Sequence, residues 1–211
     1  MRQLFFALIL IIAASKIQAQ VWLILPGGRG LVPQHGFLPG KAFKFYPTIN
    51  KYDFSGLKMC VEIHDHRDSL KLVNLSCAKV DIDNTSEFAG AQGADKVGEY
   101  FENLLPQSNI KLDSTASDTL KVSLQALDAR LIGFGSITAH GLCQMKMQFR
   151  NISQTYCVDI TDKDPHSPIS PTAFVTRKTA TRVIASAGIR EVIEQFFADL
   201  KTSLDKSAAA N

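Results

Sequence analysis

The feature that most constrains the fold is a pair of alternating apolar runs between Cys143 and Ile160. Apolar side chains at every second position are typical of β-strands with one buried face. The first run comprises Cys143, Met145, Met147 and Phe149, and the second comprises Ile152, Tyr156, Val158 and Ile160. A two-residue loop at Arg150–Asn151 would place Phe149 opposite Ile152, Met147 opposite Gln154, Met145 opposite Tyr156 and Cys143 opposite Val158. The sequence therefore predicts a β-hairpin in this register.

Weaker patterns predict the other elements. A half-buried strand is expected at Leu57, Met59, Val61 and Ile63, followed by a turn at 66–69 and a returning strand with Val73, Leu75 and Cys77 on one face. A further alternating run starts at Leu120 and is expected to shift register before Phe134. Helical spacing predicts one helix over Gly93–Leu105, ended by Pro106, and a longer one from about Thr179.

Together these elements predict an α+β fold: a mostly antiparallel β-sheet with two helices packed on one face and an extended N-terminal arm. The chain is expected to divide into a signal peptide (1–19), a Gly/Pro/aromatic-rich arm (20–56), an α+β domain (57–206) and a disordered tail (207–211). The face opposite the helices would point toward water or a partner, and its side chains would be Lys58, Glu62, His64, Gln144, Lys146 and Gln148.

Residues 1–19 have the pattern of a secretory signal. Arg2 precedes an apolar run over 4–14, and Ile17-Gln18-Ala19 precedes a cleavage site near Ala19–Gln20. An uncleaved anchor is the alternative, but a run of this length is well under the ~20 residues that span a bilayer. We therefore expect a periplasmic or secreted protein, with no Cys near the cleavage site for lipid attachment.

The arm contains the candidate partner-binding residues. Its aromatic side chains include Trp22, Phe43, Phe45, Tyr46 and Tyr52, and long Gly/Pro arms are rarely needed to close a core. Packing of the arm along the protein's own sheet is an equally good interpretation. The glycine cluster at 27–30 does not predict a phosphate loop, because Pro33 and Pro39 disfavour the helix that such a loop needs.

Export makes Cys60, Cys77, Cys143 and Cys157 disulfide candidates. Alternation places Cys143 inward and Cys157 outward, and Cys60 on the polar face with Cys77 on the apolar one. These faces favour Cys77–Cys143 and Cys60–Cys157. The bridges between sequence neighbours, Cys60–Cys77 and Cys143–Cys157, would need a bulge and remain an alternative, as do free buried thiols.

His64 and His66 would point to the same side of a strand, with Glu62 behind them. Two imidazoles and a carboxylate can bind zinc or copper, but the same residues also suit a solvated polar face that runs into a turn. The sequence has no G-x-S-x-G, H-E-x-x-H, C-x-x-C or Walker-type motif. We therefore expect no enzyme activity and no cofactor. The net charge of +3 is too small to indicate nucleic-acid binding.

Three segments have positions in the order of elements that correspond to those of a known group of proteins: His64 to Asp68, Val97 to Phe101 and Glu191 to Asp199. Over residues 57–204 the order of elements resembles small bacterial envelope proteins of the YajG-like lipoprotein group and the ABC-transport auxiliary lipoproteins. The missing lipidation cysteine departs from that group. The resemblance implies a non-enzymatic component of envelope transport or assembly, with no catalytic residues to carry over.

The sequence thus predicts an exported, non-enzymatic envelope protein that binds a partner in a transport or assembly system. The partner would be another envelope protein or complex, with peripheral membrane association as a further option. A small-ligand or metal-binding protein that uses His64 and His66 is the first alternative, and a secreted hydrolase is the second.

Overall fold

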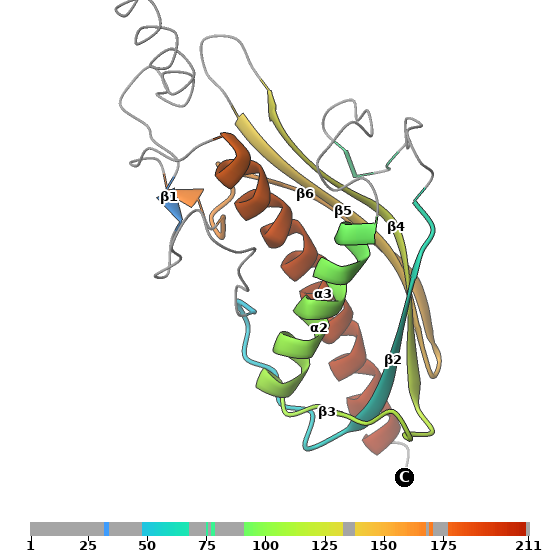
Figure 1. Ribbon diagram of the computed structural model, residues 1–211. Helices are drawn as coiled ribbons and strands as arrows, with labels where there is room; N and C mark the ends of the chain where they lie inside the picture. Colours follow the sequence, from blue (N-terminus) through green and yellow to red (C-terminus); the bar gives the residue numbers. More distant parts are fainter. Residues whose placement is uncertain are drawn as a thin grey trace, which may run out of the picture.

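The computed structural model describes residues 32–33, 48–67, 75, 77–78, 91–132, 138–167, 169–170 and 177–209. Its elements, in chain order, are β1 (Val32–Pro33), β2 (Lys58–Asp65), α2 (Ala91–Gln107), β3 (Lys111–Leu112), β4 (Thr119–Ile132), β5 (Thr138–Phe149), β6 (Ile152–Thr161), β7 (Ile169–Ser170) and α3 (Arg177–Ala209). Figure 1 shows α2 and α3 against one face of a curved sheet. The α+β class is confirmed.

The main sheet has five strands in the order β3-β2-β4-β5-β6. Strands β4, β5 and β6 form an antiparallel meander, whereas β2 runs parallel to both β3 and β4. The predicted hairpin register is confirmed: Phe149 pairs with Ile152, Met147 with Gln154, Met145 with Tyr156, and Cys143 with Val158. Parallel pairing of β2 arises because its neighbours β3 and β4 both follow α2, which carries the chain back across the sheet.

The predicted register shift in the long strand is confirmed. Pairing of β4 with β5 shifts between Leu124 and Ala126, so one extra residue enters β4 there. The extra residue reverses the alternation, and Leu124 and Leu127 consequently both lie in the core under the helices. Ala126 faces the other side, where it packs with Leu75 and Leu142.

The helices are slightly longer than expected. Helix α2 extends past Pro106 to Gln107, and Asn109 then adopts a positive φ of 57° while Ile110 N–H donates to the Leu105 carbonyl at 3.0 Å. This is a Schellman cap with asparagine in the left-handed position. Helix α3 continues to Ala209, into the residues expected to form a tail, because alanine strongly favours helix at its end.

The path of the chain after β2 differs from the expected hairpin. Leu75, Cys77 and Ala78 lie outside any strand, on the face of the sheet opposite the helices. Leu75 is buried there, because it covers apolar side chains that the bulge and the alternation leave on that face. The expected polar face is therefore exposed only in part: Lys58, Glu62, His64, Lys146 and Gln148 are exposed, whereas Gln144 is half-buried.

Candidate functional site

A groove lies along the outer edge of β2, between that strand and α2. Its pocket has a volume of about 270 Å³ and is lined by Met59, Cys60, Val61, Ile63, Gly98, Phe101, Glu102, Leu112, Asp113 and Ser114. Leu112 is the most exposed large apolar side chain in the described part of the chain, at 41%. The floor of the groove is therefore apolar and its rim is polar, as in many binding sites.

Gly98 leaves the space for this groove. It lies on the same side of α2 as the core residues Val97 and Phe101, in a position where a larger residue would fill the gap to β2. A Cβ atom added to Gly98 would meet only the Ile63 Cδ1 atom, at 3.7 Å. That distance is an ordinary van der Waals contact, so the glycine is not required by close packing.

The short β3 strand leaves most of the outer edge of β2 unpaired. Lys111 N–H donates to the Leu57 carbonyl at 2.8 Å and Asp113 N–H to the Met59 carbonyl at 3.0 Å, and the chain then leaves β2. On the other edge, the Cys60 amide donates to Asp118 and the His66 amide to Leu124, both in the direction of β4. Even-numbered residues of β2 thus bond to β4, because strand backbone groups alternate in direction.

The alternation assigns the outer edge to the odd-numbered residues. By this alternation, the amide and carbonyl groups of Val61 and Ile63 point toward the groove, and the register of β2 with β3 ends at Met59, before it reaches them. In Figure 1, β2 is the edge strand beside α2, with β3 only at its start. An unpaired strand edge of this kind is a template for pairing with another extended chain.

Acidic side chains follow the groove along α2. Asp95, Gly98 and Glu102 form one stripe of the helix, at spacings of three and four residues. Asp95 and Glu102 are exposed and form no ion pair within the described residues, whereas Glu99 pairs with Lys96 at 2.6 Å. At the end of β3, hydrogen bonds from Thr115 lower the pKa of Asp113, and this carboxylate lies 3.8 Å from the Lys58 ammonium group.

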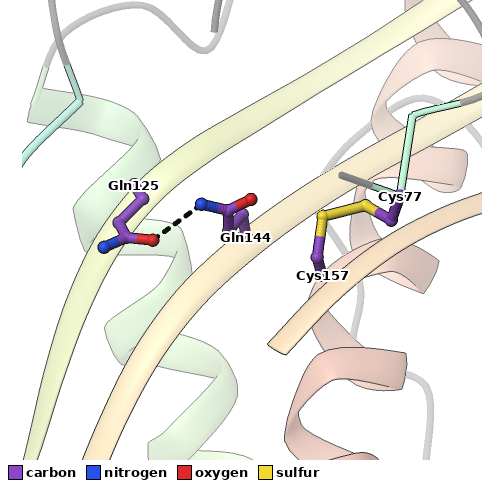
Figure 2. The surroundings of a disulfide bond; sticks show 4 residues. All are labelled: Cys77, Gln125, Gln144 and Cys157. Atoms are coloured by element: carbon purple, nitrogen blue, oxygen red, sulfur yellow. Dashed lines mark hydrogen bonds between the residues drawn. A yellow bond between two sulfur atoms is a disulfide. The ribbon is translucent and has the colours of Figure 1, made fainter. Parts of the chain in front are cut away.

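The cysteines pair differently from either expected scheme. Cys77 bonds to Cys157, and Cys60 and Cys143 are free thiols. The predicted orientations of Cys143 and Cys157 are correct, since Cys143 is buried under the helices and Cys157 faces the other side. The predicted bridges are wrong because Cys77 is carried across the back of the sheet to β6, beside the Gln125–Gln144 hydrogen bond of 2.7 Å (Figure 2). Burial raises the pKa of the Cys143 thiol.

The same back face holds buried charges that sequence reasoning did not select. Asp128 accepts a hydrogen bond from Arg130 Nε at 2.7 Å, and His140 Nδ1 lies 2.9 Å from Asp159 Oδ1. The Asp159 side chain is fully buried and that of His140 is only 8% exposed. Paired burial of this kind avoids the cost of an isolated buried charge.

The candidate metal ligands lie in an exposed strip at the end of β2 and just after it. The His64 and His66 rings stack with centroids 6.0 Å apart, and His64 Nε2 is 4.0 Å from Glu62 Oε2. His66 Nδ1 instead contacts the Ser123 hydroxyl. Throughout the described residues, no three His, Cys, Asp or Glu side chains form a group that could hold a metal ion, so Glu62, His64 and His66 do not form such a set.

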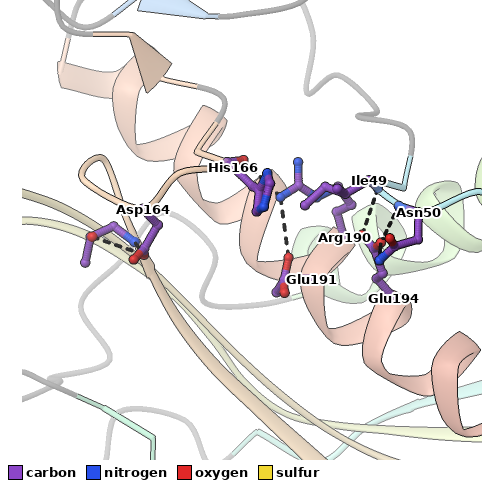
Figure 3. A network of polar contacts seen from close by, with 8 residues as sticks. Ile49, Asn50, Asp164, His166, Arg190, Glu191 and Glu194 are labelled. Carbon is purple, nitrogen blue, oxygen red and sulfur yellow. Dashed lines mark hydrogen bonds and ion pairs between the residues drawn. The ribbon is translucent and has the colours of Figure 1, made fainter.

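The described end of the arm packs on the protein itself. The Ile49 and Asn50 amides donate to the Glu194 carboxylate at 2.9 and 2.7 Å, as Figure 3 shows. The Tyr52 ring packs edge-on against Phe197 with centroids 5.5 Å apart. Residues 48–54 therefore lie along α3. Of the five candidate aromatics only Tyr52 lies within the described residues; Trp22, Phe43, Phe45 and Tyr46 lie outside them, as do the expected signal residues 1–19.

Among the described residues, none of the helices has the length and apolarity that a membrane-spanning segment needs. No family model matches the chain. No curated protein matches it either.

Solved structures that are similar to the chain include two of low sequence identity. One is the crystal structure of a protein from Xanthomonas campestris assigned to the family DUF330, with 12% identity and a TM-score of 0.43, covering 81% of this chain and 97% of that one. The other is the crystal structure of an uncharacterized protein, with 13% identity and a TM-score of 0.32, covering 72% of this chain and 98% of that one. The similarity to YajG-like lipoproteins stays a prediction.

Proposed function

We propose that this chain is an exported, non-enzymatic envelope protein that binds another protein as part of a transport or assembly system. The observation that carries the proposal is the groove at the outer edge of β2, where unpaired backbone groups, an apolar floor and an exposed Leu112 lie together. Exposed apolar surface with a polar rim is typical of protein-binding sites.

The disulfide supports export. Disulfides persist in oxidising compartments and are rare in the cytosol, and the Cys77–Cys157 bridge is consistent with a location outside the cytoplasm. Together with the signal-like pattern at 1–19, this favours the periplasm of a bacterial envelope as the place where the partner is met.

Photo-crosslinking in the native cell tests the proposal. A benzoylphenylalanine at position 112, replacing Leu112 on the groove, should give a discrete protein adduct in the envelope fraction. The matched control carries the same group in place of Thr155, an exposed residue of β6, which lies at the other side of the sheet from β3 and β2. Absence of any adduct from position 112, or equal adducts from both positions, would contradict partner binding at this surface.

A further inference from the structure

We infer that the partner is bound as an added β-strand: an extended peptide segment with an apolar side chain between two basic ones, which pairs with the outer edge of β2. This inference rests on the proposed function and specifies how the partner is recognised. It follows from three features of the same groove: the direction of the backbone groups, the shape of the pocket and the charge of α2.

The backbone supplies the main contact. Lys111 of β3 and Asp113, just after it, donate to the Leu57 and Met59 carbonyls, and the ladder is then interrupted at the point where the pocket begins. The groups of Val61 and Ile63 continue the same edge at the strand spacing. A peptide that occupies the line of β3 would satisfy these groups by main-chain hydrogen bonds, as in other cases of β-strand addition.

The pocket accepts one side chain of that peptide. Successive side chains of a strand alternate between the two faces, so every second residue of the added strand would point toward α2. The pocket of about 270 Å³ lies between Gly98, Phe101 and Leu112, and it has room for one medium-sized apolar side chain. Burial of a leucine there contributes to affinity without any rearrangement of the helix.

The charge of α2 selects the neighbours of that apolar residue. Asp95 and Glu102 lie seven residues apart, which is about 10 Å along a helix. On a strand, the residues two before and two after a central position lie about 13 Å apart on the same face. Lysine or arginine at those two positions would therefore reach the carboxylates of Asp95 and Glu102, which have no ion-pair partner among the described residues, one on each side of the pocket.

Two other occupants fit the observations less well. A second copy that paired β2 with β2 around a two-fold axis would place both α2 helices on the same face, with Asp95 and Glu102 of each copy facing those of the other. Of the chain's own residues between β2 and α2, the described ones, Leu75, Cys77 and Ala78, lie on the back of the sheet and not at this edge. An extended basic peptide matches the acidic rim.

The test uses the full chain after export and a defined synthetic probe, acetyl-Thr-Lys-Thr-Leu-Thr-Lys-Thr-amide. Amide hydrogen exchange and ¹⁵N–¹H spectra are recorded with and without the peptide. In the free protein, the Val61 and Ile63 amides should exchange at least about tenfold faster than those of Glu62 and His64. The peptide should slow exchange at Val61 and Ile63 and shift their resonances.

The controls separate strand addition from nonspecific binding. Replacing both lysines of the probe by glutamate should weaken binding at least about tenfold, since the acidic rim then repels the peptide. Backbone N-methylation at alternate residues gives two further probes, and only the one whose methyl groups face β2 should lose binding. Equal binding by all of these peptides would overturn the inference.

The protein variant is Gly98→Leu, with Asn103→Leu as its matched control on an exposed part of the same helix. The leucine at position 98 should fill the groove and weaken the probe at least about tenfold, while the fold is retained because the added Cβ meets only a side chain. Binding that survives Gly98→Leu would overturn the inference.

The outcomes also separate this inference from the proposed function. Slow exchange of the Val61 and Ile63 amides in the free protein would overturn strand addition by a partner. Protection that does not depend on the protein concentration would identify the protein's own chain as the occupant. Protection that increases with the protein concentration would identify a second copy. A cellular adduct at position 112 that persists in Gly98→Leu would overturn strand addition and leave partner binding intact. Absence of any cellular adduct, with the probe still bound by the purified protein, would overturn the proposed function and leave the recognition mode intact.

Discussion

Helices α2 and α3 cover the same face of the sheet but approach it in different ways. Where α3 crosses β5, Gly141 and Gly188 face each other, and a Cβ added to Gly141 would lie 2.0 Å from the Ile184 carbonyl oxygen. Where α2 passes β2, a Cβ added to Gly98 would lie 3.7 Å from a side-chain carbon. The first contact brings backbone against backbone, and the second leaves a pocket.

The difference shows that a glycine in a helix–sheet contact can have two opposite roles. In the α3 contact, glycine removes side chains from both elements so that the helix can approach a strand closely, and the packing around it is complete. In the α2 contact, a single glycine faces the unpaired edge of a strand, and the missing side chain leaves space beside open backbone groups. The rigid part of the molecule and its proposed binding surface are thus built from the same residue type.

The largest expected effect tests the α3 contact. Gly141→Ala should lower the free energy of unfolding by about 4 kcal/mol, because the new methyl group meets helix backbone that cannot rotate away. Chemical denaturation with urea, followed by far-UV circular dichroism, measures the loss. Gly188→Ala is the graded control: its Cβ would lie 3.1 Å from the Gly141 carbonyl oxygen, so we expect a loss of about 1 kcal/mol. Equal stability of wild type and Gly141→Ala would show that the two elements can separate freely.

The disulfide tests whether the back of the sheet is held as firmly as the helix face. The Cys77–Cys157 bridge closes a sequence separation of 80 residues. Removing it in the double variant Cys77→Ser, Cys157→Ser should cost about 3 kcal/mol, chiefly because the unfolded chain gains conformational freedom. Cys60→Ser, at a free thiol, should leave stability nearly unchanged. A non-reduced peptide map should show this single bridge with thiols at Cys60 and Cys143; any other pairing would contradict the structure.

The strand register of the hairpin could be read directly from the sequence because it depends on a local property. Side chains alternate with a period of two, and a slip by one residue would expose Met145 and Met147 to water. The same rule gave the correct faces for Cys143 and Cys157. The alternating strands were predictable for this reason, and the final helix was predictable from another local pattern, apolar side chains at helical spacing.

The disulfide could not be predicted, because it depends on where a connecting segment runs. Alternation assigns each cysteine to a face but does not say which strand the chain crosses between β2 and α2. The expected return of 73–77 as a hairpin partner placed Cys77 on the apolar face with Cys143, whereas Cys77 lies on the back of the sheet, bonded to Cys157 of β6, with Leu75 buried nearby. Sequence separation alone contains no information about this crossing.

The groove could not be predicted either, since it arises from the absence of pairing beyond β3. A short strand is expected over Ile110–Leu112, but so short a run does not say which strand it pairs with or how much of that strand's edge it covers. Gly98 is the one residue that could have drawn attention, because it interrupts the buried stripe of an otherwise good helix. The partner-binding prediction for the arm stays open for Trp22, Phe43, Phe45 and Tyr46, whereas Tyr52 contacts α3.

A smaller effect, of opposite sign, tests the α2 contact. Gly98→Ala should raise the free energy of unfolding by about 0.5–1 kcal/mol, because alanine favours helix and the added methyl group meets no backbone. The same urea titration as for Gly141→Ala provides the comparison. A destabilisation at position 98 as large as that at 141 would show that the two contacts are equally close and that no groove is present.

The smallest expected effect concerns the ion pair at the open end of β2. Hydrogen bonds from Arg67 hold the pKa of Asp65 below its usual value, with Arg67 Nε at 2.8 Å from Asp65 Oδ1. A carboxyl whose pKa is lower in the folded state stabilises the fold above its unfolded pKa of about 3.9, and this contribution disappears as the pH falls through the folded pKa. Asp65→Asn should therefore cost about 0.3–0.5 kcal/mol at pH 7 and progressively less below about pH 4. Asp205→Asn, at an exposed pair on α3, is the control. A cost for Asp65→Asn that does not depend on pH would mean that the asparagine disturbs packing, and that this end of β2 is as tightly constrained as the α3 contact.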